Sequence, residues 1–430
     1  MSKHVVSVVR HEDTYSSLKK ALELCDGLKE FNKKDKILIK PNIVNWDFDL
    51  PFPPYGVVTT TALIFALVRL LHEEGYHKIA IGEGTLSVTG TMAREIFKAL
   101  GYEKLREKYG VEIVDFNHEK FEDVDFGGFK LSLAGRALRA DRIINVPVLK
   151  THNQCKVSLG IKNFKGCLDR KSKISCHNSS GDLESIFPRI AEKLPVALTI
   201  IDGIFALAQG PGITGKAVRK DILAASRDVL ACDVVGAALL GHHAADVPHL
   251  KFYGDISQRN TDLSEIEVRG EPVEEHSVHL PYDWEWTEEN SGPVAFKKRG
   301  ITGLSVRKYD NSLCTACSKL YNPMLVLLMS AFRGEPFPGV EVITGKSQTA
   351  SPGFEKTVLF GKCACLQNKD NPDIKKAIRI NGCPPDIKKL VTSLKEEGID
   401  CDFSQYVEYR HYLFNRYLGK EGFDQGLFIM

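Results

Sequence analysis

The sequence has 430 residues, and its 57 lysines and arginines against 55 aspartates and glutamates give a formal net charge of +2 at pH 7. Balanced charge excludes the basic footprint of a protein that binds nucleic acid or a membrane surface through its overall charge. With 43% hydrophobic and 26% charged residues, the composition is that of a globular protein. No apolar run approaches the roughly 20 residues of a membrane-spanning helix, and the N-terminal residues do not resemble a targeting segment, so we expect a cytoplasmic protein.

The first 250 residues alternate short apolar segments, rich in β-branched residues, with longer segments of helical periodicity. This alternation is typical of a parallel sheet whose strands are joined by crossover helices. We therefore predict an α/β fold with a mostly parallel sheet. The predicted strands are residues 5–9, 36–39, 78–81, 111–114, 142–148 and 197–201. The predicted helices are residues 17–28, 60–74, 91–100 and 229–240.

Changes in composition divide the chain into three parts. Residues 1–250 form the predicted α/β substrate-binding domain. Residues 251–310 form an extension with an acidic aromatic stretch around Trp284 and Trp286, which we interpret as a surface loop or a partner contact. Residues 311–430 carry six of the eleven cysteines and end in a helical, aromatic tail. We predict a smaller, cysteine-rich α+β domain there.

Polar residues follow four of the predicted strands. Ligands of open parallel sheets bind beyond the carboxyl ends of the strands, where loops and helix N-termini meet. One of these regions, residues 150–173, carries seven basic residues against a single acidic one, Asp169, which favours a small phosphate or carboxylate ligand. We predict that the substrate-binding residues are Lys40, Asn42, Glu83, Thr151, Asn163, Lys165, Gly166 and Asp202.

Lys150, His152 and Lys162 are the candidate catalytic groups of this region. A lysine in a crowded cationic site shifts toward its neutral form, and a histidine exchanges protons near neutral pH. Because clustered ammonium groups repel one another, their convergence implies a negative partner, for which we expect a small anionic substrate. Aromatic residues are too sparse here for a nucleic-acid surface.

The C-terminal cysteines predict a metal centre. Cys314 and Cys317 have the two-residue spacing that lets two thiolates face one metal, and Cys363 and Cys383 bring the number to four. Four thiolates can hold a [4Fe-4S] cluster or zinc, and the proline after Cys383 favours the cluster. Cys365 is an alternative third ligand, since it lies only two residues beyond Cys363.

Several short motifs together resemble the DUF362 family, a set of uncharacterised proteins often associated with iron-sulfur clusters. They comprise residues 40–42 (Lys-Pro-Asn), 82–84 (Gly-Glu-Gly), 145–152 (Asn-Val-Pro-Val-Leu-Lys-Thr-His), 160–163 (Gly-Ile-Lys-Asn), 165–166, 202–203, 210–212 and 233–236. The resemblance implies a cluster by association and establishes no reaction. Where family members carry a ferredoxin-like appendage they usually have compact cysteine runs, whereas this sequence disperses its four cysteines, so the type of cluster depends on their spacing.

Together these features favour an iron-sulfur oxidoreductase that passes single electrons from a [4Fe-4S] cluster to a small anionic substrate, in an anaerobic setting. The expected partners are that substrate and a ferredoxin-type electron donor, with no nucleic acid and no membrane, and a homodimer is compatible with the sequence. One alternative is a non-redox lyase, isomerase or racemase that acts on an anionic metabolite and has a structural metal site. A second alternative is an electron-transfer partner protein.

Overall fold

The computed structural model describes residues 4–43, 52–85, 93–178, 180 and 183–429. Residue contacts divide the chain into two compact units. Unit 1 comprises Met1–Lys173, Glu184–Asp283 and Tyr417–Met430, and unit 2 comprises Ile174–Leu183 and Trp284–Arg416. The break after Asp283 falls inside the predicted extension, and the last residues return to unit 1. Across the described residues, every helix is too short or too polar to cross a bilayer.

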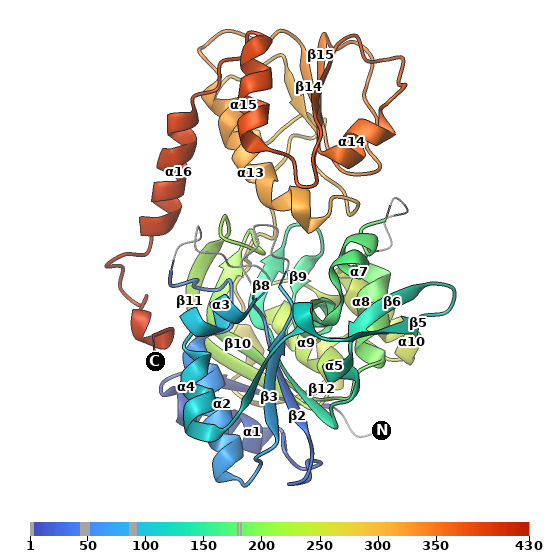
Figure 1. The fold of residues 1–430 in the computed structure, drawn as a ribbon. Helices are drawn as coiled ribbons and strands as arrows, with labels where there is room; N and C mark the ends of the chain where they lie inside the picture. Colours follow the sequence, from blue (N-terminus) through green and yellow to red (C-terminus); the bar gives the residue numbers. More distant parts are fainter. Residues whose placement is uncertain (1–3, 44–51, 86–92, 179, 181–182, 430) are drawn as a thin grey trace. The chain divides into compact units, whose positions relative to one another are not determined.

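Unit 1 is built around one large, mostly parallel sheet (Figure 1). Its strands are β1 (His4–Arg10), β2 (Ile37–Pro41), β3 (Ile79–Glu83), β4 (Glu112–Asp115), β7 (Arg142–Val146), β8 (Val148–His152), β9 (Lys156–Ser158), β10 (Val196–Ala208), β11 (Lys216–Ser226) and β12 (Ile266–Gly270). They lie in the order β12-β1-β11-β10-β7-β2-β3-β4, with β8 paired to β10 and β9 paired to β8. Two further strands, β5 (Phe121–Asp125) and β6 (Lys130–Ala134), form a separate hairpin.

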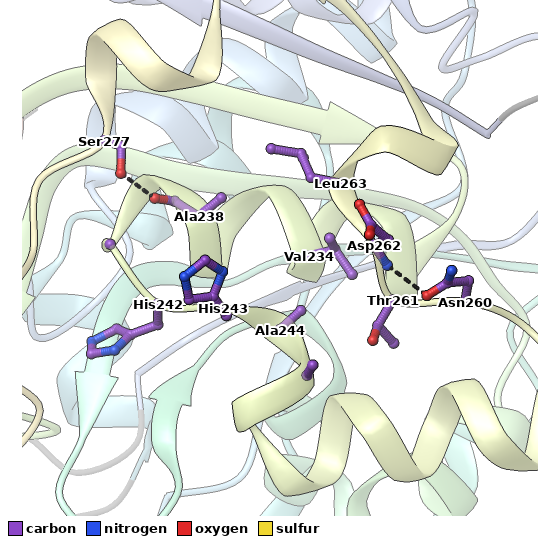
Figure 2. Close-up of a pocket in the computed structure, with 12 residues that line it drawn as sticks. Val234, Ala238, His242, His243, Ala244, Asn260, Thr261, Asp262, Leu263 and Ser277 are labelled. Carbon is purple, nitrogen blue, oxygen red and sulfur yellow. Dashed lines mark hydrogen bonds between the residues drawn. The ribbon is translucent and has the colours of Figure 1, made fainter.

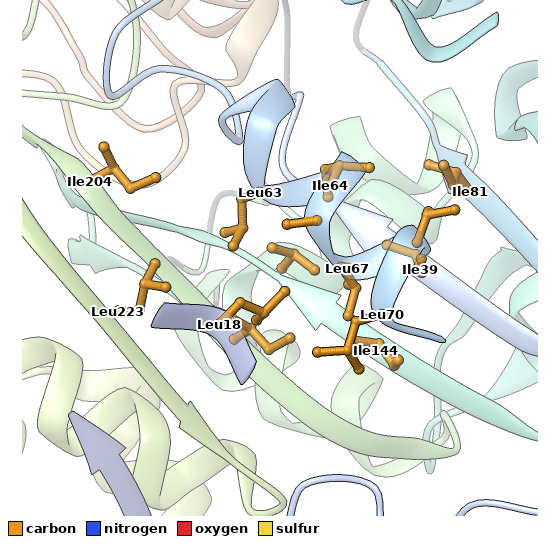
Figure 3. Close-up of a cluster of buried hydrophobic side chains, with 14 of the residues drawn as sticks. Leu18, Ile39, Leu63, Ile64, Leu67, Leu70, Ile81, Ile144, Ile204 and Leu223 are labelled. Carbon is orange, nitrogen blue, oxygen red and sulfur yellow. The ribbon is translucent and has the colours of Figure 1, made fainter. Parts of the chain in front are cut away.

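Helices cover both faces of this sheet. They are α1 (Thr14–Leu24), α2 (Thr61–Glu73), α3 (Ala93–Ala99), α4 (Tyr102–Tyr109), α5 (Gly135–Leu138), α6 (Gly160–Asn163), α7 (Arg170–Ser175), α8 (Leu183–Glu192), α9 (Val229–Leu239), α10 (Pro248–Ser257) and α11 (Val273–His276). Leu18 of α1 and Leu63 of α2 belong to a core that includes Ile200 (Figure 3). The neighbouring Ile201 points to the other face, where it contacts Gly236 of α9. A strand buried on both faces is apolar throughout, which explains the continuous apolar runs of the sequence.

The structure confirms the predicted fold class and refines the strands. The strand predicted over residues 142–148 is two strands, β7 and β8, divided at Pro147, which has no N–H to donate. The strand predicted to end at residue 201 continues as β10 to Ala208, so Asp202 lies within it and not after it. The antiparallel strand β11 was not predicted.

Unit 2 has a second, smaller sheet whose strands are all parallel, in the order β13-β14-β15-β16. Its elements are α12 (Val294–Lys298), β13 (Leu304–Val306), α13 (Thr315–Ser330), β14 (Val340–Ile343), β15 (Lys356–Phe360), α14 (Lys362–Gln367), β16 (Ala377–Ile380), α15 (Ile387–Glu396) and α16 (Phe403–Asn415). The acidic aromatic stretch is anchored here, because Trp284 and Trp286 pack against the core and Trp286 Nε1 donates to the Val306 carbonyl at 3.0 Å.

The last residues of the chain pack into the core of unit 1. Phe428 is buried there, and its ring contacts those of Tyr55 and Phe205. The Tyr55 hydroxyl donates to the Phe423 carbonyl at 2.9 Å, and the Tyr417 and Phe423 rings are stacked 4.4 Å apart. The tail beyond α16 is therefore part of the hydrophobic core of unit 1.

Candidate functional site

The carboxyl ends of β2 and β3 carry a buried ion pair. Lys40 Nζ lies 2.9 Å from Glu83 Oε2, and both side chains are shielded from solvent. The ammonium group also donates to the Pro41 carbonyl at 3.0 Å. The backbone N–H groups of Gly84 and Ile43 donate to the two carboxylate oxygens at 2.8 and 3.1 Å. Both buried charges therefore have hydrogen-bond partners within unit 1, which a stable buried pair requires.

Two asparagines connect this pair to Lys150. Asn42 Nδ2 donates to Asn163 Oδ1 at 2.8 Å, and Lys40 Nζ donates to the same oxygen at 3.3 Å. Lys150 Nζ donates to Asn42 Oδ1 at 2.5 Å. The structure thus brings together five of the predicted site residues, which we call the strand-end network: Lys40, Asn42, Glu83, Lys150 and Asn163.

The strand-end network changes the electrostatic argument made from the sequence. We expected the converging lysines to need an anion from outside, but Glu83 supplies the negative charge that faces Lys40. Burial, reinforced by the charge of Lys162, lowers the pKa of Lys150 to about 7. The inference of a missing anion is therefore wrong for Lys40, while substrate binding by these side chains stays a prediction.

Gly166 lies directly against the strand-end network. A Cβ atom at this position would lie 2.1 Å from Glu83 Oε1 and 2.7 Å from Lys40 Nζ. Gly84 is similarly crowded, because its Cβ would lie 2.6 Å from the Gly166 carbonyl oxygen. Lys173, also buried, donates to the Gly84 carbonyl at 2.6 Å. Glycine is required at both positions because backbone and charged side chains approach so closely.

Three other predicted residues bind the backbone of unit 1. Thr151 Oγ1 donates to a carbonyl of β10 at 3.0 Å. The Thr60 N–H, at the start of α2, donates to Asp202 Oδ2 at 2.6 Å, and burial raises the pKa of that carboxyl. His152 Nδ1 accepts from the Gln154 N–H at 3.1 Å. The hydrogen bonds of these three residues therefore support the sheet edge.

Asp233, within α9, fixes the helix that carries Lys162. It belongs to one of the motifs noted in the sequence but was not among the predicted site residues. The N–H groups of Gly160 and Ile161, at the start of α6, donate to its two carboxylate oxygens at 2.7 and 2.8 Å. Asp233 is fully buried, and burial raises its pKa to about 7. The sequence does contain a signal for it, since an acidic residue inside an otherwise apolar helix needs a specific partner.

Replacing Asp233 with asparagine should change how stability depends on pH. Asp233 holds its proton more tightly when folded, at a pKa of about 7, than in the unfolded chain, at about 3.9. Its contribution is therefore largest below about pH 4 and is lost as the pH rises toward 7. Asparagine does not ionise, so the stability advantage of the wild type over Asp233→Asn should shrink by about 2.5 kcal/mol between about pH 5 and pH 8. Urea unfolding measures this, and an advantage that is constant or grows with pH would contradict it.

The four predicted metal ligands come from three segments of unit 2 that meet at Gly361. The Lys362 N–H donates to the Gly382 carbonyl at 2.9 Å, so the segments that carry Cys363 and Cys383 lie side by side. A Cβ on Gly361 would lie 3.1 Å from Cys317 Sγ. Among the described residues, no three histidine, cysteine or acidic side chains form a ready metal-binding group.

The protonation states of these thiols are linked. A hydrogen bond from Cys317 lowers the pKa of Cys314 to about 6, and the same interaction raises the pKa of Cys317. Burial raises the pKa of Cys363, and the charge of Lys346 opposes this. Cys365 differs in its contacts, because its Sγ donates to the Leu359 carbonyl at 3.5 Å. Burial raises the pKa of Cys365, and the charges of Arg379 and Lys389 oppose this.

A pocket of about 590 Å³ lies beside the end of α9 in unit 1 (Figure 2). Among the described residues that line it are His242, His243 and Asp262. His242 Nε2 lies 2.9 Å from the Leu280 carbonyl oxygen, and Asp262 accepts from the Ser264 N–H at 2.9 Å. None of the predicted site residues is among the lining residues, so this pocket is distinct from the strand-end network.

Fold and motifs together define an α/β protein with a buried lysine-carboxylate network at the carboxyl ends of parallel strands. The family model "Domain of unknown function (DUF362)" matches residues 37–238. The thylakoid-associated protein sll1697 of Synechocystis sp. is 30% identical over 238 residues, which cover 54% of this chain and 72% of that protein. The chain belongs to the DUF362 family, as its motifs indicated.

Solved structures match more distantly, and one of them is a racemase apoprotein. The lactate racemase apoprotein from Thermoanaerobacterium thermosaccharolyticum aligns with a TM-score of 0.35 and 16% sequence identity. The alignment covers 55% of this chain and 57% of that one, so the chain spans little more than half the length of that protein.

Proposed function

We propose that this protein is an iron-sulfur oxidoreductase that exchanges single electrons with a small anionic substrate. Unit 2 would hold a [4Fe-4S] cluster through Cys314, Cys317, Cys363 and Cys383, and the lysine-rich strand ends of unit 1 would bind the substrate. A ferredoxin-type protein is the proposed electron donor. The cytoplasm is the proposed location, because it keeps thiols reduced.

The observation that carries the proposal is the convergence of three cysteine-bearing segments at Gly361. The Gly361 and Lys362 N–H groups donate to the carbonyls of Ile380 and Gly382, at 3.0 and 2.9 Å. Cys317 Sγ also lies close to Gly361, because a Cβ atom at this glycine would be 3.1 Å from the sulfur. Glycine at this position allows the three cysteine-bearing segments to approach one another closely, and its positive φ of 103° also favours glycine.

The donor set fits an iron-sulfur cluster. It consists of four thiols, the ligands that such clusters use, and Cys314 ionises near neutral pH. When bound, the cluster would supply one-electron redox chemistry that protein side chains lack. Cys363 is favoured over Cys365 as third ligand, because the Cys365 thiol is hydrogen-bonded to the Leu359 carbonyl within its own segment.

Anaerobic purification should yield brown protein that contains iron and acid-labile sulfide. Replacing Cys383 with serine should remove most of its absorbance near about 400 nm, because a four-thiolate cluster loses one ligand. Cys365→Ser is the matched control, since it changes a neighbouring thiol that is outside the proposed set, and it should keep the absorbance. Ultraviolet-visible spectra and metal analysis of the three proteins measure this.

Stoichiometric zinc without iron would overturn the cluster and leave a structural zinc site. Full absorbance in Cys383→Ser would show that Cys383 is not a ligand. Loss of absorbance in Cys365→Ser would show that Cys365 is a ligand. An electron-transfer partner protein, the second alternative, would contain the cluster but would bind neither phosphate nor carboxylate compounds at unit 1.

A non-redox lyase, isomerase or racemase is favoured by one observation, the lowered pKa values of buried lysines. Burial lowers the pKa of Lys150 to about 7 and those of Lys162 and Lys173 to about 8. Amines that titrate near neutral pH suit acid–base chemistry on an anionic metabolite. Turnover that survives oxidative destruction of the metal centre would favour this function over the redox one.

A further inference from the structure

Lys162 differs from the other buried lysines at this edge of the sheet. Lys40 donates to Glu83, and Lys173 donates to the Gly84 carbonyl. Lys150 donates to Asn42 and to the Val57 carbonyl at 2.8 Å. In the described part of the chain, the Lys162 amine makes neither a hydrogen bond nor an ion pair, and its side chain is half-buried. Its amine is therefore not occupied by a fixed partner.

The surroundings of the Lys162 amine are aromatic. Its Nζ atom lies 5.5 Å from the centre of the Phe187 ring, over the ring. The His249 ring packs edge-on against the Phe187 ring, with ring centres 5.8 Å apart. His249 Nδ1 lies 2.8 Å from Glu184 Oε2, and its Nε2 is buried without a hydrogen-bond partner among the described residues. The aromatic ring attracts the ammonium group but offers no carboxylate or carbonyl oxygen to accept its hydrogen bonds.

Five titratable groups surround this amine. Burial is the main cause that lowers the pKa of Lys162 to about 8, and the charge of Lys165 acts in the same direction. Glu184 and Cys155 oppose this shift. Lys150 and His249 also interact with the charge of Lys162. Near pH 7.5 a much larger fraction of such an amine is neutral than of an ordinary lysine.

We propose that Lys162 is a nucleophilic amine that forms an imine with a small carbonyl compound bearing a carboxylate or phosphate. The neutral amine attacks the carbonyl carbon, the carbonyl oxygen leaves as water, and a C=N bond forms whose nitrogen takes up one proton. A desolvated lysine beside a second cation is the environment that activates amines for this reaction. The Lys165 ammonium favours a substrate with an anionic group.

This inference specifies the anionic substrate of the proposed function as a carbonyl compound. It rests on the proposed function only in assuming that the substrate is anionic. It makes no use of the four cysteines proposed to hold the cluster. Cys383→Ser protein should therefore form the imine as the wild type does, so failure of the metal centre and failure of the imine are separate results.

The test is reductive trapping of the full-length protein. Pyruvate or dihydroxyacetone phosphate, with cyanoborohydride near pH 7.5, should add one adduct at Lys162, located by peptide mass spectrometry. Labelling should be on the order of 100-fold faster than at exposed lysines, in keeping with the larger neutral fraction. The two probes distinguish a carboxylate from a phosphate substrate, and acetone, which has no anionic group, should react more slowly.

Lys162→Arg should lose the adduct, whereas Lys165→Arg, which keeps a charge beside the intact amine, should keep it. Adducts at Lys150 in place of Lys162, or equal labelling of all exposed lysines, would overturn the proposal. If Lys162→Arg does not fold, the pH profile of the wild type decides, because half-maximal trapping is expected near pH 8 and not near 10.

Glu184 is a positioning residue in this arrangement, and the pH profile tests that role. Its carboxylate stabilises the Lys162 ammonium, so Glu184→Gln should lower the pKa of the amine and shift half-maximal trapping to lower pH. A role confined to packing would leave the midpoint unchanged, and an unchanged midpoint would refute this part of the inference.

Discussion

Replacing Glu83 with glutamine is expected to destabilise the protein by about 3 to 5 kcal/mol, the usual result of removing one partner of a buried ion pair. The buried Lys40 amine would lose the carboxylate that lies 2.9 Å away and has no solvent to replace it. Urea unfolding followed by circular dichroism measures the loss.

Two further variants show whether the buried charge is the cause. The double variant Lys40→Met with Glu83→Gln removes both charges and should recover part of the stability that Glu83→Gln loses. Glu112→Gln breaks an exposed pair with Arg136, at 2.7 and 2.9 Å, and should cost less than about 1 kcal/mol. Equal losses in Glu83→Gln and Glu112→Gln would show that burial does not matter here.

Replacing Gly166 with alanine should be nearly as damaging, at about 3 kcal/mol, because overpacking forces neighbours out of place. The added Cβ would lie 2.1 Å from Glu83 Oε1 and 2.7 Å from Lys40 Nζ. To make room, the ion pair must separate or the short 3-10 helix over Phe164–Cys167, which carries Gly166, must move away. Thermal or urea unfolding of the variant measures the cost.

Gly212→Ala is the matched control for this substitution. A Cβ at Gly212 would meet nothing within 4 Å, so its effect should stay within about 0.5 kcal/mol. A wild-type stability for Gly166→Ala would mean that the close approach at the strand-end network is not tight in solution.

The predicted elements came from apolar periodicity, and they failed where a strand lacks it. β11 begins with the mixed polar sequence of residues 216–221, and its buried half is short, so no regular pattern marks it. Asp202 was predicted to follow the strand because the apolar run of residues 197–201 is followed by a charged residue and a glycine, which is typical of a turn. The Thr60 N–H makes the burial of the Asp202 carboxylate possible, and Thr60 is 142 residues away in the sequence.

The location of the site could be predicted from the sequence, but the partners of its charged side chains could not. Strand ends of a parallel sheet meet at one edge, so Lys40, Asn42 and Lys150 could be placed together. That Glu83 neutralises Lys40 follows from the adjacency of β2 and β3, which sequence order alone does not fix. The contact between Glu184 and His249, 65 residues apart, had no local signal at all.

The packing of the C-terminal tail has a consequence for biosynthesis. Tyr55 and Phe423 are 368 residues apart and yet share a hydrogen bond within the core of unit 1. While the ribosome is still translating unit 2, the aromatic surface of Tyr55 and Phe205 lacks Phe428, the ring that finally covers it. Domains usually fold as soon as they emerge, in order from the N-terminus. Here the synthesis of unit 1 begins before that of unit 2, but its core is complete only when the C-terminal tail has been made. A nascent or truncated chain therefore exposes an apolar aromatic surface that chaperones and proteases can recognise.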